Sequence, residues 1–251
     1  MTPNTESRRA VIVEGLDIDS RVLLAARALR AGEVVAIPTD TVYGLAAAIN
    51  RPGAIEHLYS IKSRPPEKSI PILLSDLKEL HQVSTSLPET AAHLVQCFWP
   101  GALTLVVPAL PHLPTRVTSF TSDGTKTVAV RVPDSTIARA IISAAGGALA
   151  VTSANRSGEE PALSARDVAG LGGENRILVI DGGRAPGGVP SSVVLATGST
   201  PVMIREGAIS SIEISARMAE FPVESDREST TRYDQPMTEP QEYQCLTETR
   251  P

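Results

Sequence analysis

The sequence predicts an α/β fold built on a twisted, mixed β-sheet that is flanked by helices. Short runs of Val, Ile and Leu alternate along the chain with stretches whose apolar residues have helical spacing, a pattern typical of layered α/β proteins. At 251 residues and 42% hydrophobic, the chain is long enough for one substantial core. Aromatic residues make up only 3%, so that core must be aliphatic, and base stacking on aromatic platforms is not expected as the main mode of action.

The first half of the chain is expected to alternate strands with two well-delimited helices. The helix at 19–31 takes Asp19 or Ser20 as its N-cap and ends at Gly32. A helix at 53–62 is stopped by the double proline that follows it. The other expected elements are strands at 11–15, 34–38, 70–74 and 103–108, an apolar segment at 42–49 and a helix near 88–98.

The second half repeats this alternation and ends in a polar tail. Strands are expected at 127–132, 147–152 and 176–181, further β segments at 192–197 and 201–205, and helices at 135–145, 164–171 and 210–220. The last 30 residues are rich in Glu, Thr, Gln and Pro and cannot bury enough surface to offset their ordering entropy. We therefore expect a flexible N-terminus at 1–9, one domain at 10–221 and a disordered acidic tail at 222–251.

Charge and cysteine content limit the classes of function. Residues 1–215 carry 19 basic and 20 acidic side chains, so an anionic ligand must be held by a local basic cluster. Only Cys97 and Cys245 occur, which favours a reducing compartment over a disulfide framework. The N-terminus lacks a secretory signal, and the longest apolar stretch, 140–151, is too short to span a bilayer. These features predict a cytoplasmic protein without a membrane segment.

The usual nucleotide and metal signatures are missing from the sequence. There is no GxxxxGK[ST] loop, and no GxGxxG follows a strand. HExxH and CxxC are missing as well, and the four histidines lack the spacing of metal ligands. We expect no protein-held metal site and no histidine-based catalytic triad.

Two polar clusters in the first half each allow two interpretations. Residues 39–41 (Thr-Asp-Thr) directly follow an apolar strand, where open α/β sheets place their ligands, but Thr and Asp also favour simple capped turns. Three cations lie within 62–68, where Lys62 and Arg64 could bind phosphate oxygens or only complement the negative end of a helix. Either cluster could be a site or local structure.

Further polar groups emerge from strands in the second half. A period of two places Arg131 on one face of an apolar strand together with Thr127, so its charge needs an anionic partner, which a substrate carboxylate or phosphate would supply. Ser153 and Asn155 follow another buried strand. Two more candidates complete the set, Ser191 and Arg205. Together these groups predict a pocket for a phosphorylated ligand and a small polar one.

Seven motifs in this order and spacing resemble the YrdC/TsaC family of threonylcarbamoyl-AMP synthases. They are PTDTVYGL, the KSR step, FWPGALTLVV, TVAVRVP, TSAN, DGG…PSSVV and the final arginine, and the resemblance covers roughly residues 10–215. It implies a YrdC-like sheet with a central concave cleft. It also implies that L-threonine, bicarbonate or CO2, and ATP become L-threonylcarbamoyladenylate and pyrophosphate. A separate transferase would then modify tRNAs that read codons beginning with A.

The resemblance also implies roles for individual residues. Lys62 and Arg64 match the catalytic pair that holds the triphosphate. The residues that match the threonine site are Thr39, Arg131 and Ser191. Those that match nucleotide contacts are Thr127, Ser153, Asn155, Ser157 and Arg205, besides the catalytic pair. Glu206 stands where the family commonly has proline, and the tail is too short and polar for the second domain of longer members.

The implied chemistry needs positioned charges and no nucleophilic side chain. An N-carboxylate formed from threonine and CO2 attacks the α-phosphorus, and cations stabilise the leaving pyrophosphate. Mg2+ bound with ATP is the implied cofactor. The implied partners are ATP, L-threonine and bicarbonate, a tRNA threonylcarbamoyl transferase complex that receives the product, and a weak RNA contact. Two alternatives remain: a non-catalytic RNA-binding or ribosome-assembly factor, and a different ATP-using carbamoylation enzyme.

Overall fold

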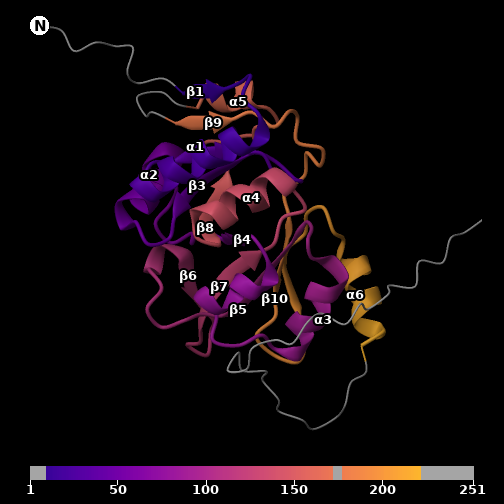
Figure 1. Cartoon of the computed structure of the whole chain (residues 1–251). Helices are drawn as coiled ribbons and strands as arrows, with labels where there is room; N and C mark the ends of the chain where they lie inside the picture. Colours follow the sequence, from indigo (N-terminus) through magenta and orange to yellow (C-terminus); the bar gives the residue numbers. More distant parts are fainter. Residues whose placement is uncertain (1–9, 172–176, 222–251) are drawn as a thin grey trace, which may run out of the picture.

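The computed structural model describes residues 10–171 and 177–221, which form a single mixed sheet with helices on both faces (Figure 1). The predicted flexible N-terminus at 1–9 and the predicted disordered tail at 222–251 lie outside the described residues. The strands are β1 (Val11–Val13), β2 (Val35–Ile37), β3 (Gly44–Ala48), β4 (Ile72–Leu74), β5 (Leu103–Pro108), β6 (Thr118–Phe120), β7 (Lys126–Arg131), β8 (Ala148–Ser153), β9 (Leu178–Ile180), β10 (Ser192–Leu195) and β11 (Val202–Arg205).

The sheet is mixed, as the sequence predicts. Its strand order is β1-β9-β2-β3-β8-β4-β7-β5-β10-β11, and β6 pairs with β7 beside this path. β4 runs parallel to β7, whereas β5 and β6 run antiparallel to it. The central strand β3 has the sequence GLAAA and is buried throughout, because helices cover both faces of the sheet at this point.

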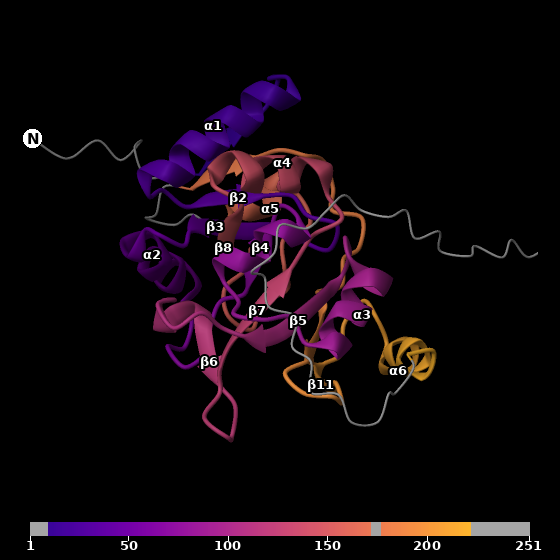
Figure 2. The same ribbon diagram turned by 60° about the horizontal axis from the view of Figure 1, so that its bottom comes forward.

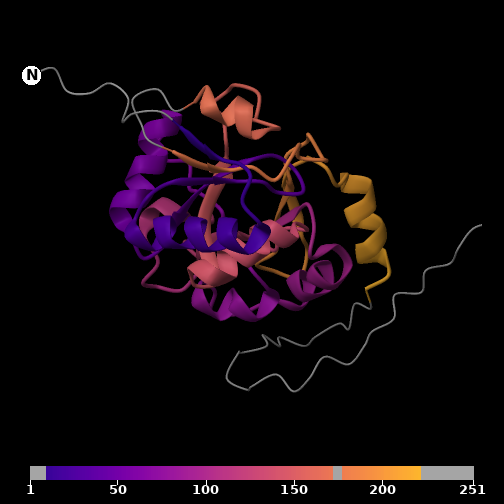
Figure 3. The ribbon, with the colours of Figure 1, turned by 45° about the horizontal axis from the view of Figure 1, so that its top comes forward.

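The helices are α1 (Ile18–Ala31), α2 (Pro52–Lys62), α3 (Glu89–Phe98), α4 (Thr136–Ala145), α5 (Ala165–Ala169) and α6 (Ser211–Ala219), with short 3-10 helices η2 (Leu77–Gln82) and η3 (Thr115–Val117). α1 and α4 pack together over one face of the sheet, where Leu29 and Ile141 belong to the smaller core cluster (Figures 2 and 3). The other helices contribute to the larger cluster on the opposite face, and α3 packs against α6 there. No helix in the described ranges has both the length and the apolar character needed to cross a membrane.

The structure corrects several details of the expected elements. α1 begins one residue earlier than predicted, and its N-cap is Asp17, whose Oδ1 accepts the Ser20 amide at 2.8 Å; the prediction of Asp19 or Ser20 as the cap was wrong. Gly32 ends this helix in the left-handed region, with φ at 89°, as predicted. β6 and the two 3-10 helices were missed because segments of three to six residues are too short to show a hydrophobic period.

Candidate functional site

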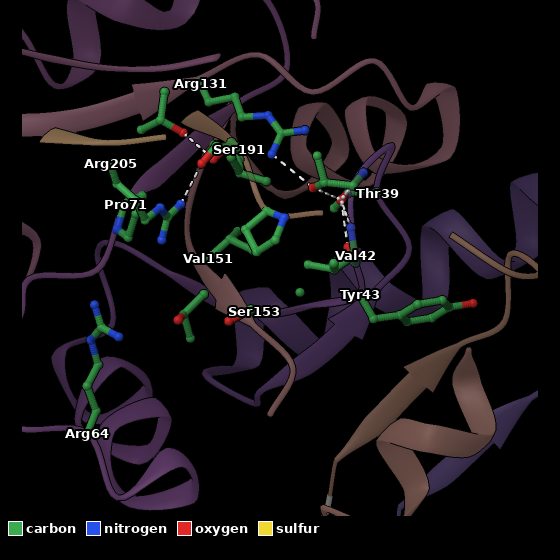
Figure 4. Close-up of a pocket in the computed structure, with 16 residues that line it drawn as sticks. Thr39, Val42, Tyr43, Arg64, Pro71, Arg131, Val151, Ser153, Ser191 and Arg205 are labelled. Atoms are coloured by element: carbon green, nitrogen blue, oxygen red, sulfur yellow. Dashed lines mark hydrogen bonds between the residues drawn. The ribbon is translucent and has the colours of Figure 1, made fainter. Parts of the chain in front are cut away.

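A pocket lies against the central strands of the sheet (Figure 4). Its lining includes paired residues of neighbouring strands: Gly44 pairs with Ser153 across β3 and β8, and Leu73 pairs with Arg131 across β4 and β7. The lining combines apolar walls with hydroxyls and guanidinium groups. It consists of Thr39, Thr41, Val42, Tyr43, Gly44, Arg64, Pro71, Leu73, Thr104, Arg131, Val151, Thr152, Ser153, Pro190, Ser191 and Arg205.

A chain of hydrogen bonds links Arg131 to the Thr39 turn. Arg131 Nη1 donates to Thr41 Oγ1 at 3.1 Å, the Thr41 and Thr39 hydroxyl oxygens are 3.0 Å apart, and Thr39 Oγ1 donates to the Val42 carbonyl at 2.6 Å. Because a guanidinium only donates and each hydroxyl has one proton, Thr41 donates to Thr39. Thr39 therefore stabilises its own turn, as the turn interpretation expects, and it also lines the pocket, where its role toward a ligand stays a prediction.

Arg131 is buried and forms an ion pair within the chain. Its residue exposure is 5%, and its Nη2 lies 2.5 Å from Asp40 Oδ1, while its Nε donates to the Gly101 carbonyl at 2.7 Å. Burial lowers the pKa of Arg131, and the neighbouring Asp40 carboxylate opposes this shift. The expectation that the buried Arg131 has a partner is met within the chain by Asp40, and the role of Arg131 toward a ligand stays a prediction.

Ser191 and Thr104 form a second hydroxyl pair in the pocket. Their oxygens are 2.8 Å apart and both residues are buried. Arg205 Nη2 donates to the Ser191 carbonyl at 2.6 Å, which joins the end of β11 to this pair. Gly207 allows this close approach, because a Cβ there would lie 2.3 Å from the Pro190 oxygen. The neighbouring Glu206 is exposed, so the contact between Arg205 and Ser191 forms despite the glutamate.

Arg64 reaches the pocket from the loop that follows α2. The chain turns at Ser63, which lies in the left-handed region with φ at 50°. The Arg64 guanidinium donates to the Lys68 carbonyl at 2.8 Å and to the Ser69 carbonyl at 2.7 Å. The Tyr59 hydroxyl lies 2.7 Å from the same Lys68 oxygen, so it supports the loop that orients Arg64.

Lys62, the last residue of α2, is buried beside the pocket at 2% exposure. Its Nζ donates to the Ser153 carbonyl at 2.5 Å, to the Asn155 carbonyl at 2.9 Å and to Asn155 Oδ1 at 2.7 Å. All of these acceptors are formally neutral, and no ion pair within the described ranges includes Lys62. Burial, with a smaller contribution from the charge of Arg64, lowers the pKa of Lys62 to about 8.

Two arginines that line the pocket carry positive charge that no acidic side chain of the described residues neutralises. Arg64 and Arg205 both line the pocket, and neither takes part in an ion pair among the described residues. Burial and then the charges of Arg64 and Arg131 lower the pKa of Arg205, as expected for cations that share a cavity. No group of three His, Cys, Asp or Glu that could hold a metal ion occurs in the part of the chain that the structure describes.

The structure brings most of the predicted site residues together. Six of them line the pocket, namely Thr39, Arg64, Arg131, Ser153, Ser191 and Arg205. Lys62 and Asn155 are next to the lining residue Ser153. The Lys62 ammonium donates to the Ser153 carbonyl and to Asn155 Oδ1. Thr127 is buried in β7 and donates to the Ser119 carbonyl at 3.2 Å, and Ser157 is exposed, so neither is among the lining residues. The nucleotide roles of these residues stay predictions.

Three functional candidates were not singled out from the sequence. Thr41 and Asp40 were considered only as members of the 39–41 cluster, which could be a site or a turn, because their contacts with Arg131 depend on the fold. Thr104 did have a signal, since it is the one polar residue in the apolar run of β5, LTLVVP, and it is buried at 3% exposure.

Comparisons with known proteins agree with this arrangement. The profile of the Sua5–YciO–YrdC family, described as telomere recombination, matches residues 27–207. The chain belongs to this family. A threonylcarbamoyl-AMP synthase from Bacillus subtilis is 36% identical over 93% of this chain and 66% of its own length. A second one, from Pyrococcus abyssi, is 35% identical over 81% of this chain and 58% of its own.

Solved structures of family members have the same fold. The crystal structure of P. abyssi Sua5 complexed with L-threonine is 34% identical, with a TM-score of 0.75 over 84% of this chain and 62% of that one. Escherichia coli YciO is 27% identical, with a TM-score of 0.67 over 79% of this chain and 94% of that one. The chain thus spans about two thirds or less of these two synthases and most of the length of YciO.

Proposed function

We propose that this chain makes L-threonylcarbamoyladenylate from L-threonine, bicarbonate or CO2, and ATP, and releases pyrophosphate. The observation that carries this proposal is a single pocket with two chemically different groups of side chains. Arg64 and Arg205 present uncompensated charge, whereas Arg131 is paired with Asp40 and bonded to the Thr41 hydroxyl, and the Thr104–Ser191 hydroxyl pair borders Arg205. Phosphates suit the uncompensated arginines, and a small amino acid suits Arg131 and the hydroxyls. The relatives named threonylcarbamoyl-AMP synthases and the neighbour complexed with L-threonine support the same activity.

The reaction requires the chain to hold its substrates and to stabilise charge. The threonine ammonium gives up two protons to solvent as its nitrogen forms a C–N bond to CO2. An oxygen of the resulting N-carboxylate then attacks the α-phosphorus as the bond to pyrophosphate breaks. Arg64 and Arg205, together with the buried Lys62 that is hydrogen-bonded to the Ser153 carbonyl, would neutralise the charge that develops on the leaving group. Arg131 would hold the amino acid through its two remaining N–H bonds.

Mg2+ fits this proposal as a companion of ATP. The described residues offer no carboxylate cage, which suits an ion held mainly by phosphate oxygens and water. When bound, the ion would withdraw charge from the phosphates and favour departure of pyrophosphate. We also propose that the product passes to a tRNA threonylcarbamoyl transferase complex and that the enzyme is a nucleotidyltransferase.

The experiment that tests the proposal is pyrophosphate release from ATP, Mg2+ and bicarbonate, with and without L-threonine. The expected result is release that depends on L-threonine. Salt-sensitive RNA binding without such release would favour a non-catalytic RNA-binding or ribosome-assembly factor. Release supported by a different amino acid or amine would instead indicate another ATP-using carbamoylation enzyme.

A further inference from the structure

The arginines of the pocket differ in whether an acidic side chain neutralises them. Arg131 lies 2.5 Å from the Asp40 carboxylate, so this pair adds no net charge to its end of the cavity. The Arg64 and Arg205 guanidinium groups donate to backbone carbonyls, and no ion pair among the described residues includes them, so their charges are uncompensated. All three arginines line the same cavity, so each one is open to an anionic ligand.

Asp40 itself is not among the lining residues. It contacts Arg131 from outside the cavity, its side chain is 14% exposed, and its backbone oxygen accepts the Gly187 amide at 3.1 Å. Its carboxylate therefore acts on a ligand through Arg131 and through the field at that end, without touching the ligand. Arg131 keeps two N–H bonds beyond those given to Asp40, Thr41 and Gly101.

We infer that Asp40 is a specificity-determining residue that keeps phosphate away from Arg131 and so reserves this end of the pocket for the zwitterionic amino acid. The identity of the amino acid in this inference rests on the proposed function. The difference between the neutralised Arg131 and the uncompensated Arg64 and Arg205 does not. A phosphate group at Arg131 would lie close to the Asp40 carboxylate and be repelled by it. An α-amino acid brings a carboxylate for Arg131 and an ammonium that tolerates the nearby Asp40 charge. Phosphate is thereby directed to Arg64 and Arg205, which have no competing carboxylate.

The test measures binding of inorganic phosphate and of L-threonine to the whole protein by titration calorimetry. Asp40→Asn keeps an oxygen that can accept the Arg131 N–H and removes only the charge. The expected result is a second phosphate site in this variant, and L-threonine binding that weakens about 10-fold when phosphate is present, the scale of one charge-assisted hydrogen bond. The matched control is Asp19→Asn, which makes the same charge change on an exposed residue in the first turn of α1 and should behave like the wild type.

Arg131→Gln combined with Asp40→Asn keeps the test decisive if Asp40→Asn alone does not fold, because it removes both charges of the pair and leaves the net charge beside the cavity unchanged. Phosphate binding in this double variant should stay within about twofold of the wild type, because only Arg64 and Arg205 hold phosphate there. A large loss of phosphate binding in the double variant, or a single unchanged phosphate site in folded Asp40→Asn, would overturn the inference. If the wild type binds phosphate but not L-threonine, the proposed function fails. The number of phosphate sites in the wild type and in Asp40→Asn still decides the role of Asp40.

Discussion

The buried charge of Lys62 gives the protein a pH dependence that can be measured in its stability. Burial lowers the pKa of this side chain from 10.5 to about 8 in the folded chain. The folded state therefore releases the proton near pH 8, whereas the unfolded chain keeps it until about pH 10.5. Between these values the unfolded state binds more protons, so the free energy of unfolding must rise with pH.

The magnitude follows from this difference in proton binding. At 1.36 kcal/mol per pKa unit, the full effect is about 3 kcal/mol, and the part gained between pH 7.5 and 9.5 is about 2 kcal/mol. The range stops at pH 9.5 because Tyr43 and Tyr59 have the opposite effect at higher pH. Burial raises their pKa values in the folded chain, so their ionisation in the unfolded chain lowers the free energy of unfolding. Lys62→Met removes the titrating group while keeping a long side chain.

The assay is urea unfolding of the ligand-free wild type and of Lys62→Met at several pH values from 7.5 to 9.5. The wild-type free energy of unfolding should rise by about 2 kcal/mol relative to that of the variant. A bound triphosphate should hold the proton on Lys62, so the affinity for ATP should fall over the same range in the wild type only. Parallel stability curves for the two proteins would refute the conclusion that the buried Lys62 ammonium is poorly compensated.

Other perturbations separate the two ends of the pocket. Arg64→Ala should reduce turnover about 10-fold or more, the value of one charge-assisted contact, as should Lys62→Ala; a wild-type rate of pyrophosphate release would exclude the altered residue from phosphate stabilisation. Thr39→Val should raise the KM for L-threonine more than that for ATP, and an equal rise in both would contradict the assignment. Tyr59→Phe removes only the hydroxyl that supports the Arg64 loop, so the KM for ATP alone should rise; equal change in the L-threonine KM would argue against this. Gly207→Ala should lower stability by about 1–3 kcal/mol because its Cβ has no room; unchanged thermal unfolding would contradict the close packing.

The pattern of the sequence was sufficient for most of the fold. Apolar runs such as the one at 103–108 became strands because β-branched and leucine side chains fill a sheet that is covered on both faces. Helix ends were predictable where one residue fixes the geometry, as Gly32 does in its left-handed conformation. The N-cap of α1 was misplaced because Asp17, Asp19 and Ser20 are all suitable caps, and only the backbone conformation selects among them.

The candidate site was predictable as a set of residue types but not as a set of contacts. Polar groups next to apolar strands identified Thr39, Ser153 and Ser191, and all three line the pocket. The partner of Arg131 could not be predicted from the sequence, because Asp40 lies 91 positions away along the chain. Lys62 was recognisable as a cation, but its burial and its shifted pKa depend on carbonyl oxygens near the end of β8.

By itself the sequence predicted the order of the longer strands and helices and a set of groups that could bind a phosphate and an amino acid. Hydrophobic period and turn chemistry are local properties, so they can be read within a few residues. Only the tertiary structure decided which cation is neutralised, which is buried and which faces the cavity with its charge free. Those properties depend on distances between residues far apart in the chain, and a Coulomb energy depends on separation in space rather than in sequence.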